Sequence, residues 1–311
     1  MTLQQLRAFV AIVEFGSFRR AARELDVSQA GLTGSLKALE ADLGASLLSR
    51  SAQGVKLTAE GERLLPRAQL MISEADRARD DLQQARGEPG GTLHVGMGPT
   101  PTAILLPLVV PDFHAAFPLV RLRLVSGFHE QLQPALQRGH IELAITALPD
   151  SGVGTGLTTR HLFRSKLVVV GRKGHPAAAA PSLRDLQHCE WVLLGSPGGP
   201  GSSILRVCAE NKLPPPAVAA TCESFTQLAA LIGATDWLAL VPSLLVDQGL
   251  LGIQVATIPV REATRGSDNC VIYRSDTPLT QAAAAFAAMC ESGARIVTKT
   301  PGHPRRLRRS G

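Results

Sequence analysis

The stretch that most constrains the fold runs from Ser17 to Arg50. It contains two segments whose apolar residues recur at helical spacing, and a polar break at Asp26 separates them. Ser17 and Ser28 stand where an N-cap hydroxyl can accept an unpaired backbone N–H, so we expect a helix to begin after each of them. Two short helices joined by a tight turn are typical of a helix-turn-helix motif.

Each expected helix has an inner and an outer face. The residues expected to face inward are Ala21, Ala22 and Leu25 in the first helix and Leu32, Leu36 and Leu39 in the second. The outer face of the second helix carries polar side chains that can contact base edges and phosphates. The candidate DNA-binding residues are Gln29, Thr33, Ser35 and Lys37 on this face, with Ser17, Ser28, Arg50 and Lys56 around it. A helical hairpin with a solvated outer face would show the same pattern.

The spacing of residues 21–50 is more specific than a hairpin requires. The run AA-x2-L-x2-SQ-x2-L-x3-L-x2-LE-x2-LG-x2-LL-x-R resembles the N-terminal signature of LysR-type transcriptional regulators. It departs from that signature at Ala30 and Gly34, where the family has Pro and Arg. A glycine within a helix costs about 1 kcal/mol relative to alanine, and Gly34 supplies no long cationic side chain. The resemblance therefore implies binding to a double-stranded DNA operator and leaves the operator sequence open.

Residues 1–58 are expected to form an all-α winged helix-turn-helix domain. Residues 2–15 carry apolar side chains at helical spacing, which predicts a helix beneath the motif. After the motif, a turn signal and then alternating residues predict a short β-ribbon with Lys56 facing outward. An ordinary hairpin would have the same pattern, but its place directly after the motif favours a wing that lies along the DNA backbone.

Residues 59–91 are predicted to be a linker helix that ends in a glycine-rich hinge. Apolar residues follow one another at alternating intervals of 4 and 3, which is the pattern of a coiled-coil seam. The candidate dimerisation residues in this seam are Leu64, Met71, Ala75 and Leu82. Because a single helix would leave the seam in water, we expect it to pair with a second copy in a homodimer or homotetramer.

Residues 92–298 alternate between strand-like and helical runs, which predicts an α/β fold with mainly parallel sheets. The family resemblance implies an effector domain of two α/β lobes, like a type 2 periplasmic solute-binding protein. Lobe I is expected at about 92–164 and 266–298, and lobe II at about 165–265. Residues 299–311 form a basic tail that we expect to be disordered.

The global charge is a poor indicator of DNA binding in this chain. The net charge is +6, but residues 295–311 contain six basic side chains and no acidic one, which accounts for the whole excess. Arg7 and Glu14 interrupt the first apolar run, so we expect no signal peptide. No uncharged apolar run is long enough to cross a membrane, and we expect a cytoplasmic protein.

The sequence offers no catalytic or metal-binding set. The five cysteines are widely spaced and form no CxxC or Cys/His cluster, so we expect reduced thiols and no metal, with a redox switch as the less favoured alternative. A phosphate loop, a GxSxG elbow and a complete dinucleotide fingerprint are all missing. We therefore expect neither an enzyme nor a cofactor.

Two loops of small and hydroxyl residues, 98–102 and 195–203, follow predicted strands and open helices. Helix N-termini suit anions, and ligands of open α/β sheets lie beyond the carboxyl ends of the strands. These loops could equally be simple helix caps. In the functional interpretation they hold a small anionic effector between the lobes. The candidate effector-binding residues are Thr100 and Thr102, to which the family resemblance directs attention, and then Thr146 and Ser196.

Three classes of function fit these features. The first is a transcriptional regulator that responds to an effector, and it would contact RNA polymerase if it activates. A solute-binding protein is the second, but the helix-turn-helix and the expected lack of a signal peptide argue against it. The third is a helix-turn-helix protein whose second domain only oligomerises, and the two hydroxyl-rich loops argue against that. The first class is favoured.

Overall fold

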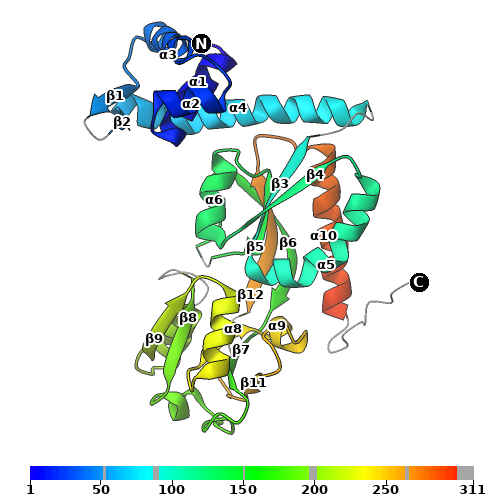
Figure 1. Cartoon of the computed structure of the whole chain (residues 1–311). Coiled ribbons are helices and arrows are strands. Elements are labelled where there is room, and N and C mark those ends of the chain that lie inside the picture. The colour runs from blue at the N-terminus through cyan, green and yellow to red at the C-terminus, as the bar shows by residue number, and fades with distance from the viewer. Residues whose placement is uncertain (52–53, 87–90, 150, 196–201, 263–265, 300–311) are drawn as a thin grey trace. The chain divides into compact units, whose positions relative to one another are not determined.

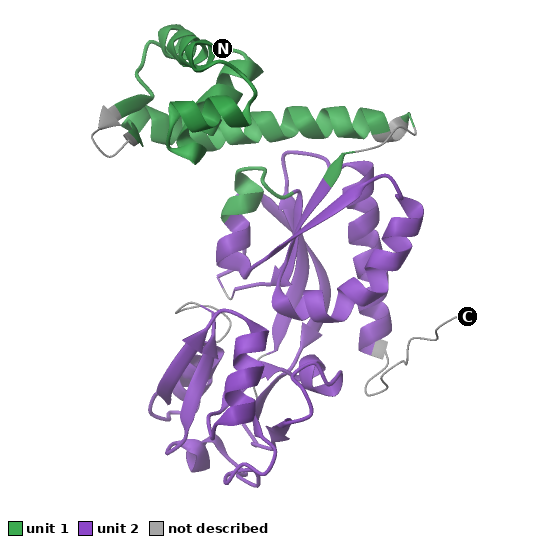
Figure 2. Ribbon diagram, in the orientation of Figure 1, with its two compact units in different colours: residues 1–92, 134–141 green, residues 93–133, 142–311 purple. Residues whose placement is uncertain are grey.

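The computed structural model describes residues 1–51, 54–86, 91–149, 151–195, 202–262 and 266–299, and Figure 1 labels its elements. These residues fall into two compact units (Figure 2). Unit 1 contains residues 1–92 and 134–141, and unit 2 contains residues 93–133 and 142–311. The predicted basic tail lies outside the described residues from 300 onward.

Unit 1 is a bundle of helices with a two-stranded ribbon. Its elements are α1 (Leu3–Phe15), α2 (Phe18–Glu24), α3 (Gln29–Leu43), β1 (Leu48–Ser51), β2 (Gly54–Leu57) and α4 (Ala59–Ala85). Its core combines side chains from α1, α2, α3 and α4 and includes Phe9, Ile12 and Leu39, all fully buried. The expected opening helix, two-helix motif and antiparallel ribbon are therefore all present.

Local sequence accounts for most of the helix ends in unit 1. The Thr2 hydroxyl accepts the Gln5 N–H at the start of α1, and the Gln5 side chain accepts the Thr2 N–H in return, forming a capping box. α1 ends at Gly16, whose φ of 63° is in the left-handed region that glycine adopts without strain. The predicted Ser28 cap is confirmed, because its Oγ accepts the Gly31 N–H at 3.0 Å.

Two local predictions in the motif are wrong. Ser17 occupies the N-cap position of α2, but its side chain makes no capping hydrogen bond. That turn is held instead by the bond from the Ala21 N–H to the Ser17 carbonyl and by the burial of Ala21 and Ala22. Leu25 is 37% exposed, because α2 ends at Glu24 and Leu25 no longer continues its inner face.

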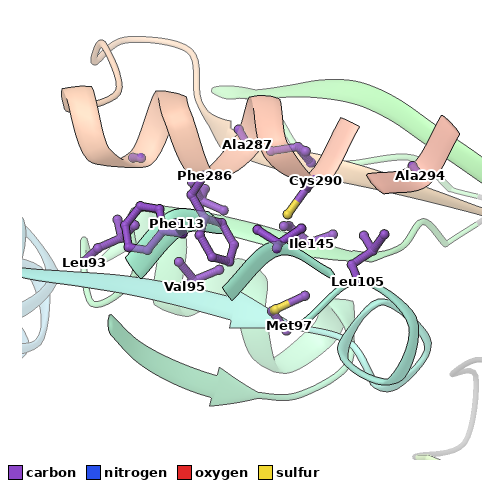
Figure 3. Packing of buried hydrophobic residues seen from close by; sticks show 14 of the residues in the cluster. Leu93, Val95, Met97, Leu105, Phe113, Ile145, Phe286, Ala287, Cys290 and Ala294 are labelled. Atoms are coloured by element: carbon purple, nitrogen blue, oxygen red, sulfur yellow. The ribbon is translucent and has the colours of Figure 1, made fainter. Parts of the chain in front are cut away.

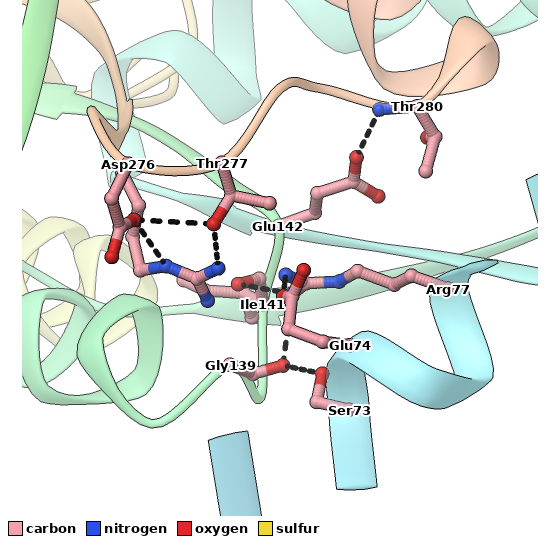
Figure 4. A network of polar contacts seen from close by, with 10 residues as sticks. Ser73, Glu74, Arg77, Gly139, Ile141, Glu142, Asp276, Thr277 and Thr280 are labelled. Carbon is pink, nitrogen blue, oxygen red and sulfur yellow. Dashed lines mark hydrogen bonds and ion pairs between the residues drawn. The ribbon is translucent and has the colours of Figure 1, made fainter. Parts of the chain in front are cut away.

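Within unit 1, α4 is joined by polar contacts to the segment that follows α6 (Figure 4). One guanidinium nitrogen of Arg77 donates to the carbonyls of Gly139 and Ile141, each at 2.9 Å. The hydroxyl of Ser73 donates to the same Gly139 carbonyl at 2.6 Å. Gly139 has a φ of +75°, and a Cβ at this position would lie 2.9 Å from the Ser73 side chain. The close approach therefore depends on a glycine.

The first lobe of unit 2 contains a five-stranded sheet in the order β4-β3-β5-β12-β6. Its elements are β3 (Thr92–Met97), α5 (Pro99–Ala116), β4 (Arg121–Ser126), α6 (His129–Gln137), β5 (Leu143–Ala147), β6 (Leu157–Ser165), β12 (Ser267–Arg274) and α10 (Gln281–Lys299). The end of α6, from Pro134 onward, belongs to unit 1. α5 and α10 pack against each other and against the sheet (Figure 3). Phe113 of α5 meets Phe286 of α10 edge to face, with ring centroids 5.2 Å apart.

The second lobe is built on β7 and β8. Its elements are β7 (Leu167–Arg172), the 3-10 helix η1 (Leu183–Leu186), β8 (Glu190–Leu194), α7 (Ser203–Glu210), β9 (Ala217–Cys222), α8 (Phe225–Ala234), β10 (Ala239–Pro242), α9 (Ser243–Asp247) and β11 (Val255–Ile258). One sheet has the order β10-β7-β11 and another pairs β8 with β9, and a bridge between Trp191 and Leu238 connects them. The chain enters this lobe after β6 and leaves it before β12.

The expectation of mainly parallel sheets is wrong. β3 and β5 are parallel, as are β8 and β9, but β12 is antiparallel to both β5 and β6, and β7 is antiparallel to both β10 and β11. Alternation of strands and helices predicts parallel crossovers only between neighbours in the sequence. β12 instead returns from the second lobe and inserts between two earlier strands. β6 itself escaped sequence analysis, because this edge strand has mostly polar residues.

Candidate DNA-reading helix and effector pocket

The outer face of α3 presents a shallow depression. Gln29, Ala30, Thr33, Gly34 and Lys37 line it. No atom lies within 4 Å of the position that a Cβ on Gly34 would take. The missing side chain of Gly34 thus leaves open space at the residue where sequence analysis found the departure from the family signature.

The polar groups on this face differ in what they can offer DNA. Gln29 and Lys37 are exposed, and an amide and an ammonium there are able to contact bases or phosphates. The Thr33 hydroxyl donates to the Gln29 carbonyl at 2.8 Å, so it can only accept a hydrogen bond from a ligand. Ser35 is half-buried on the same helix.

The remaining candidate DNA-binding residues lie around α3. Ser28 is exposed, but its Oγ already caps the helix, and Ser17 is half-buried. Lys56 is exposed on β2, where it pairs with Ser49 of β1, as expected for a wing. The backbone of Arg50 pairs with Val55, while its side chain lies outside the described part of the chain.

The predicted seam of α4 divides into two parts. Leu64 packs against the core of unit 1 beside the fully buried Ala68, so this end of the seam already has a partner within the chain. Met71 is 36% exposed, Ala75 is half-buried and Leu82 is 61% exposed. Only the part from Met71 onward presents apolar surface to a second copy.

Unit 2 contains a cavity of about 780 Å³ between its two lobes, which we call the interlobe pocket. From the first lobe, the starts of α5 and α6, the end of β5 and the start of β12 line it; from the second lobe, the start of α7 contributes Ser202, Ser203 and Arg206. Its apolar walls include Phe128, Leu148, Leu167, Leu205, Phe225 and Leu240. The size and the lining are typical of a small-molecule site.

The four candidate effector-binding residues have different positions. Thr100 and Thr146 line the interlobe pocket and are buried, and no hydrogen bond to either hydroxyl is formed within the described residues. Thr102 is not among the lining residues, and its hydroxyl donates to the Gly98 carbonyl at 2.8 Å. Ser196 lies outside the described residues. The backbone at Gly98 passes so close to Thr146 that a Cβ would lie 2.5 Å from the threonine Oγ1.

Sequence analysis missed two buried polar residues of the interlobe pocket, His129 and Asn269. His129 is the first residue of α6, and the rule that directed attention to the loop after β3 could have found it after β4. Asn269 lies on β12 opposite Ala147 of β5, a pairing across more than a hundred residues. No local pattern indicates such a pairing.

The charges of the interlobe pocket are balanced. The lining contains two arginines, Arg164 and Arg206, and two acidic residues, Glu130 and Asp268, and Arg164 lies 3.3 Å from the Asp268 carboxylate. Burial lowers the pKa of His129, and the neighbouring Glu130 offsets this only in part. The N-terminus of α5 has few free donors, since Pro99 and Pro101 have no N–H and the Thr102 N–H donates to Gly98. The anion site expected at this loop is therefore poorly equipped.

None of the cysteines lines the interlobe pocket. All five cysteines are free and buried, and burial raises the pKa of each, to about 11 for Cys270 and about 12 for Cys290. The described residues contain no group of three or more His, Cys, Asp or Glu that could hold a metal ion. Nor is any helix in the described ranges long and apolar enough to span a bilayer.

Comparison with known proteins finds relatives for both units. The model of the bacterial regulatory helix-turn-helix proteins of the lysR family matches residues 3–62, and that of the LysR substrate binding domain matches residues 86–295. The uncharacterized HTH-type transcriptional regulator YdcI of Escherichia coli (strain K12) is 27% identical over 302 residues, 96% of this chain and 95% of that protein. A probable hydrogen peroxide-inducible genes activator of Mycobacterium xenopi is 35% identical over 175 residues, 56% of this chain and 92% of that protein.

A solved structure extends the likeness to the fold. Full-length CbnR in complex with its target DNA matches with a TM-score of 0.68 and 25% identity, covering 94% of this chain and 100% of that one. These relatives are regulators and not enzymes. The chain therefore belongs to the LysR family, and it is a DNA-binding transcriptional regulator with an effector-binding domain.

Proposed function

We propose that this regulator reads its operator with the outer face of α3 and responds to a small organic molecule held in the interlobe pocket. The pocket is the observation that carries the proposal. It is lined by both lobes, has apolar walls, and contains two buried polar atoms, the Nδ1 of His129 and the Oδ1 of Asn269, with no partner within the described residues. A scaffold that served only for oligomerisation would have no need of buried polar groups without partners, because each of them costs stability.

A response to peroxide is the second candidate, since one relative is named a hydrogen peroxide-inducible genes activator. Peroxide reacts with an accessible thiolate of lowered pKa. Burial instead raises the pKa of every cysteine in this chain, and Cys290 is fully buried. The thiols therefore favour an effector that binds without oxidising the protein.

The pocket suggests how the signal begins. A ligand that contacts both lobes stabilises the lobe arrangement in which those contacts form, and so shifts the population towards it. In a homodimer or homotetramer paired through the exposed part of α4, such a shift alters the spacing of the DNA-binding units on two half-sites. Contact with RNA polymerase follows if the regulator activates. Because the matching family model is one of bacterial regulatory proteins, and bacterial DNA lies in the cytoplasm, we place this activity there.

The test is to capture genomic DNA fragments on the full chain and sequence them, with the Lys37→Ala variant as the comparison. We expect a small set of fragments that share a two-fold symmetric site and that the variant enriches less. Their neighbouring genes then supply candidate effectors for titration against the protein–DNA complex. Equal enrichment by both proteins would refute the assignment of α3, and no change in DNA binding with any ligand of the pocket would refute the switch.

A further inference from the structure

Two buried polar atoms in the interlobe pocket lack partners. Asn269 is 1% exposed and His129 is 6% exposed, and both residues line the pocket. The Oδ1 of Asn269 and the Nδ1 of His129 form no hydrogen bond with the described residues. A buried polar group left unsatisfied destabilises the fold. Atoms of this kind at a pocket wall indicate groups that a ligand completes.

The orientation of the Asn269 amide is determined by its neighbour. Its Nδ2 donates to the Ser267 carbonyl at 3.3 Å. Exchanging the amide oxygen and nitrogen would bring Oδ1 against that carbonyl oxygen, where neither atom has a proton to share. The unpartnered atom is therefore an acceptor. It requires an N–H or O–H group, and an ionised carboxylate or sulfonate has neither.

The other polar groups of the pocket are also suited to an uncharged ligand. The hydroxyls of Thr100 and Thr146 can each donate or accept. The lining contains as many acidic residues as arginines, two of each, and one of these pairs, Arg164 and Asp268, is in contact. At the N-terminus of α5, Thr100 supplies the only N–H of the first three residues, because the residues on either side of it are prolines.

We infer that the interlobe pocket binds an uncharged organic molecule with an apolar body and an N–H or O–H group that donates to Asn269. This inference rests on the proposed effector function of the pocket. It replaces the anionic effector expected from the hydroxyl-rich loops. Asn269 then determines specificity, because a site built to bond a donor rejects analogues that lack one.

Three probes of similar size separate the alternatives: benzamide, benzoate and benzylamine. Each has the same ring, and they differ in carrying a neutral donor, an anion or a cation. Binding to the full chain is measured by NMR titration with ¹³C-methyl threonine, because Thr100 and Thr146 report from within the pocket. We expect benzamide to bind about tenfold more tightly than benzoate, which corresponds to about 1.4 kcal/mol.

Two substitutions at one position test the role of Asn269. Asn269→Leu removes the acceptor and should weaken benzamide binding about tenfold while leaving benzoate binding nearly unchanged. Asn269→Asp loses the Nδ2 donor, but its protonated carboxyl can donate to the Ser267 carbonyl and keep the other oxygen as an acceptor, so this variant should retain benzamide binding in acidic buffer. Asn211→Leu is the matched control, since Asn211 is exposed and does not line the pocket.

The outcomes separate this inference from the proposed function. If benzoate binds more tightly than benzamide and neither Asn269 substitution has an effect, the inference of an uncharged ligand is refuted. The proposed role of the pocket as an effector site would still stand. If none of the probes shifts the Thr100 or Thr146 signals at millimolar concentration, the proposed function of the pocket fails as well. If Asn269→Leu does not fold, Asn269→Asp decides, because loss of benzamide binding there contradicts the donor bond.

Discussion

The outer face of α3 and the interlobe pocket are assembled in opposite ways. The α3 face comes from a single helix of 15 residues, and the positions that form it are neighbours in the sequence. The pocket collects residues from Gly98 to Asn269, carried by helix starts and strand ends in two lobes. The first surface can therefore change by single substitutions without disturbing the fold, whereas the second is coupled to its core.

The exposed part of α4 gives the largest expected effect, because the proposed mechanism couples both surfaces through the oligomer. Leu82→Asp places a charge where 61% of the side chain is exposed in the monomer, so the chain should fold normally but fail to dimerise. Operator binding should be lost with the dimer. Light scattering and a DNA mobility shift measure the two effects. Gln83→Asp, one residue away from the seam, is the control, and an unchanged oligomer in Leu82→Asp would show that the seam does not pair the chains.

Two glycines sharpen the contrast between the surfaces. A Cβ on Gly98 would lie 2.5 Å from Oγ1 of the fully buried Thr146, so Gly98→Ala should cost about 1–3 kcal/mol of unfolding free energy and weaken ligand binding. Gly34→Ala meets no atom within 4 Å and should instead stabilise α3 by up to about 1 kcal/mol. Denaturant unfolding measures both, and equal stabilities would contradict the coupling of the pocket to the core.

Lys37 tests the DNA-reading face by itself. Lys37→Ala should weaken operator binding by about 1–3 kcal/mol if the ammonium contacts a base, and similarly on all sequences, with a smaller salt dependence, if it contacts a phosphate. Thr33→Ala should have a smaller effect, because its hydroxyl already donates to Gln29. Fluorescence anisotropy at several salt concentrations distinguishes these cases. Lys173→Ala is the control, because Lys173 is an exposed lysine of the second lobe, and this variant should bind the operator like the parent. If Lys37→Ala and Thr33→Ala also bind the operator like the parent, the outer face of α3 does not contact DNA.

Thr100 and Thr102 test the pocket without disturbing the DNA-reading helix. Thr100→Val keeps the shape and removes a hydroxyl that lines the pocket, so ligand affinity should fall by about 1 kcal/mol. Thr102→Val should bind ligand like the parent, since its hydroxyl is used within α5. Operator affinity without ligand should remain unchanged in both. Calorimetry with the ligand identified from the genes next to the operator measures these affinities. A larger loss of ligand affinity in Thr102→Val than in Thr100→Val would show that Thr102, not Thr100, contacts the ligand.

The smallest expected effect is a gain in affinity for DNA. Gly34→Arg adds a cation to the open depression on α3 without a steric conflict, so stability should change by less than about 1 kcal/mol. Affinity for DNA should rise on all sequences, and the salt dependence should steepen by about one phosphate contact. A fall in operator affinity would instead show that the glycine permits a close approach of the DNA.

The sequence by itself determined the DNA-binding unit. Its helices follow from caps such as Ser28 and from apolar residues three and four positions apart, and all of these interactions lie within a few turns of chain. The wing could be predicted for the same reason, whereas the two-lobed organisation was implied only by the family resemblance. The errors at Ser17 and Leu25 lie at the two ends of α2, where a backbone bond replaced the expected cap at the start and the helix stopped one residue early at the end.

Only the tertiary structure decided the interlobe pocket. It placed Thr146 and Asn269 together by inserting β12 between β5 and β6, and it withdrew Thr102 from the lining by a bond to its own helix. It also buried the Nδ1 of His129 and the Oδ1 of Asn269 without a partner among the described residues, which is why we propose an uncharged donor in place of the expected anion. Pairing across more than a hundred residues depends on the free energy of the whole packed sheet. The hydrophobic periodicity of the sequence cannot predict such a pairing, because it indicates only which face of a helix or strand is buried.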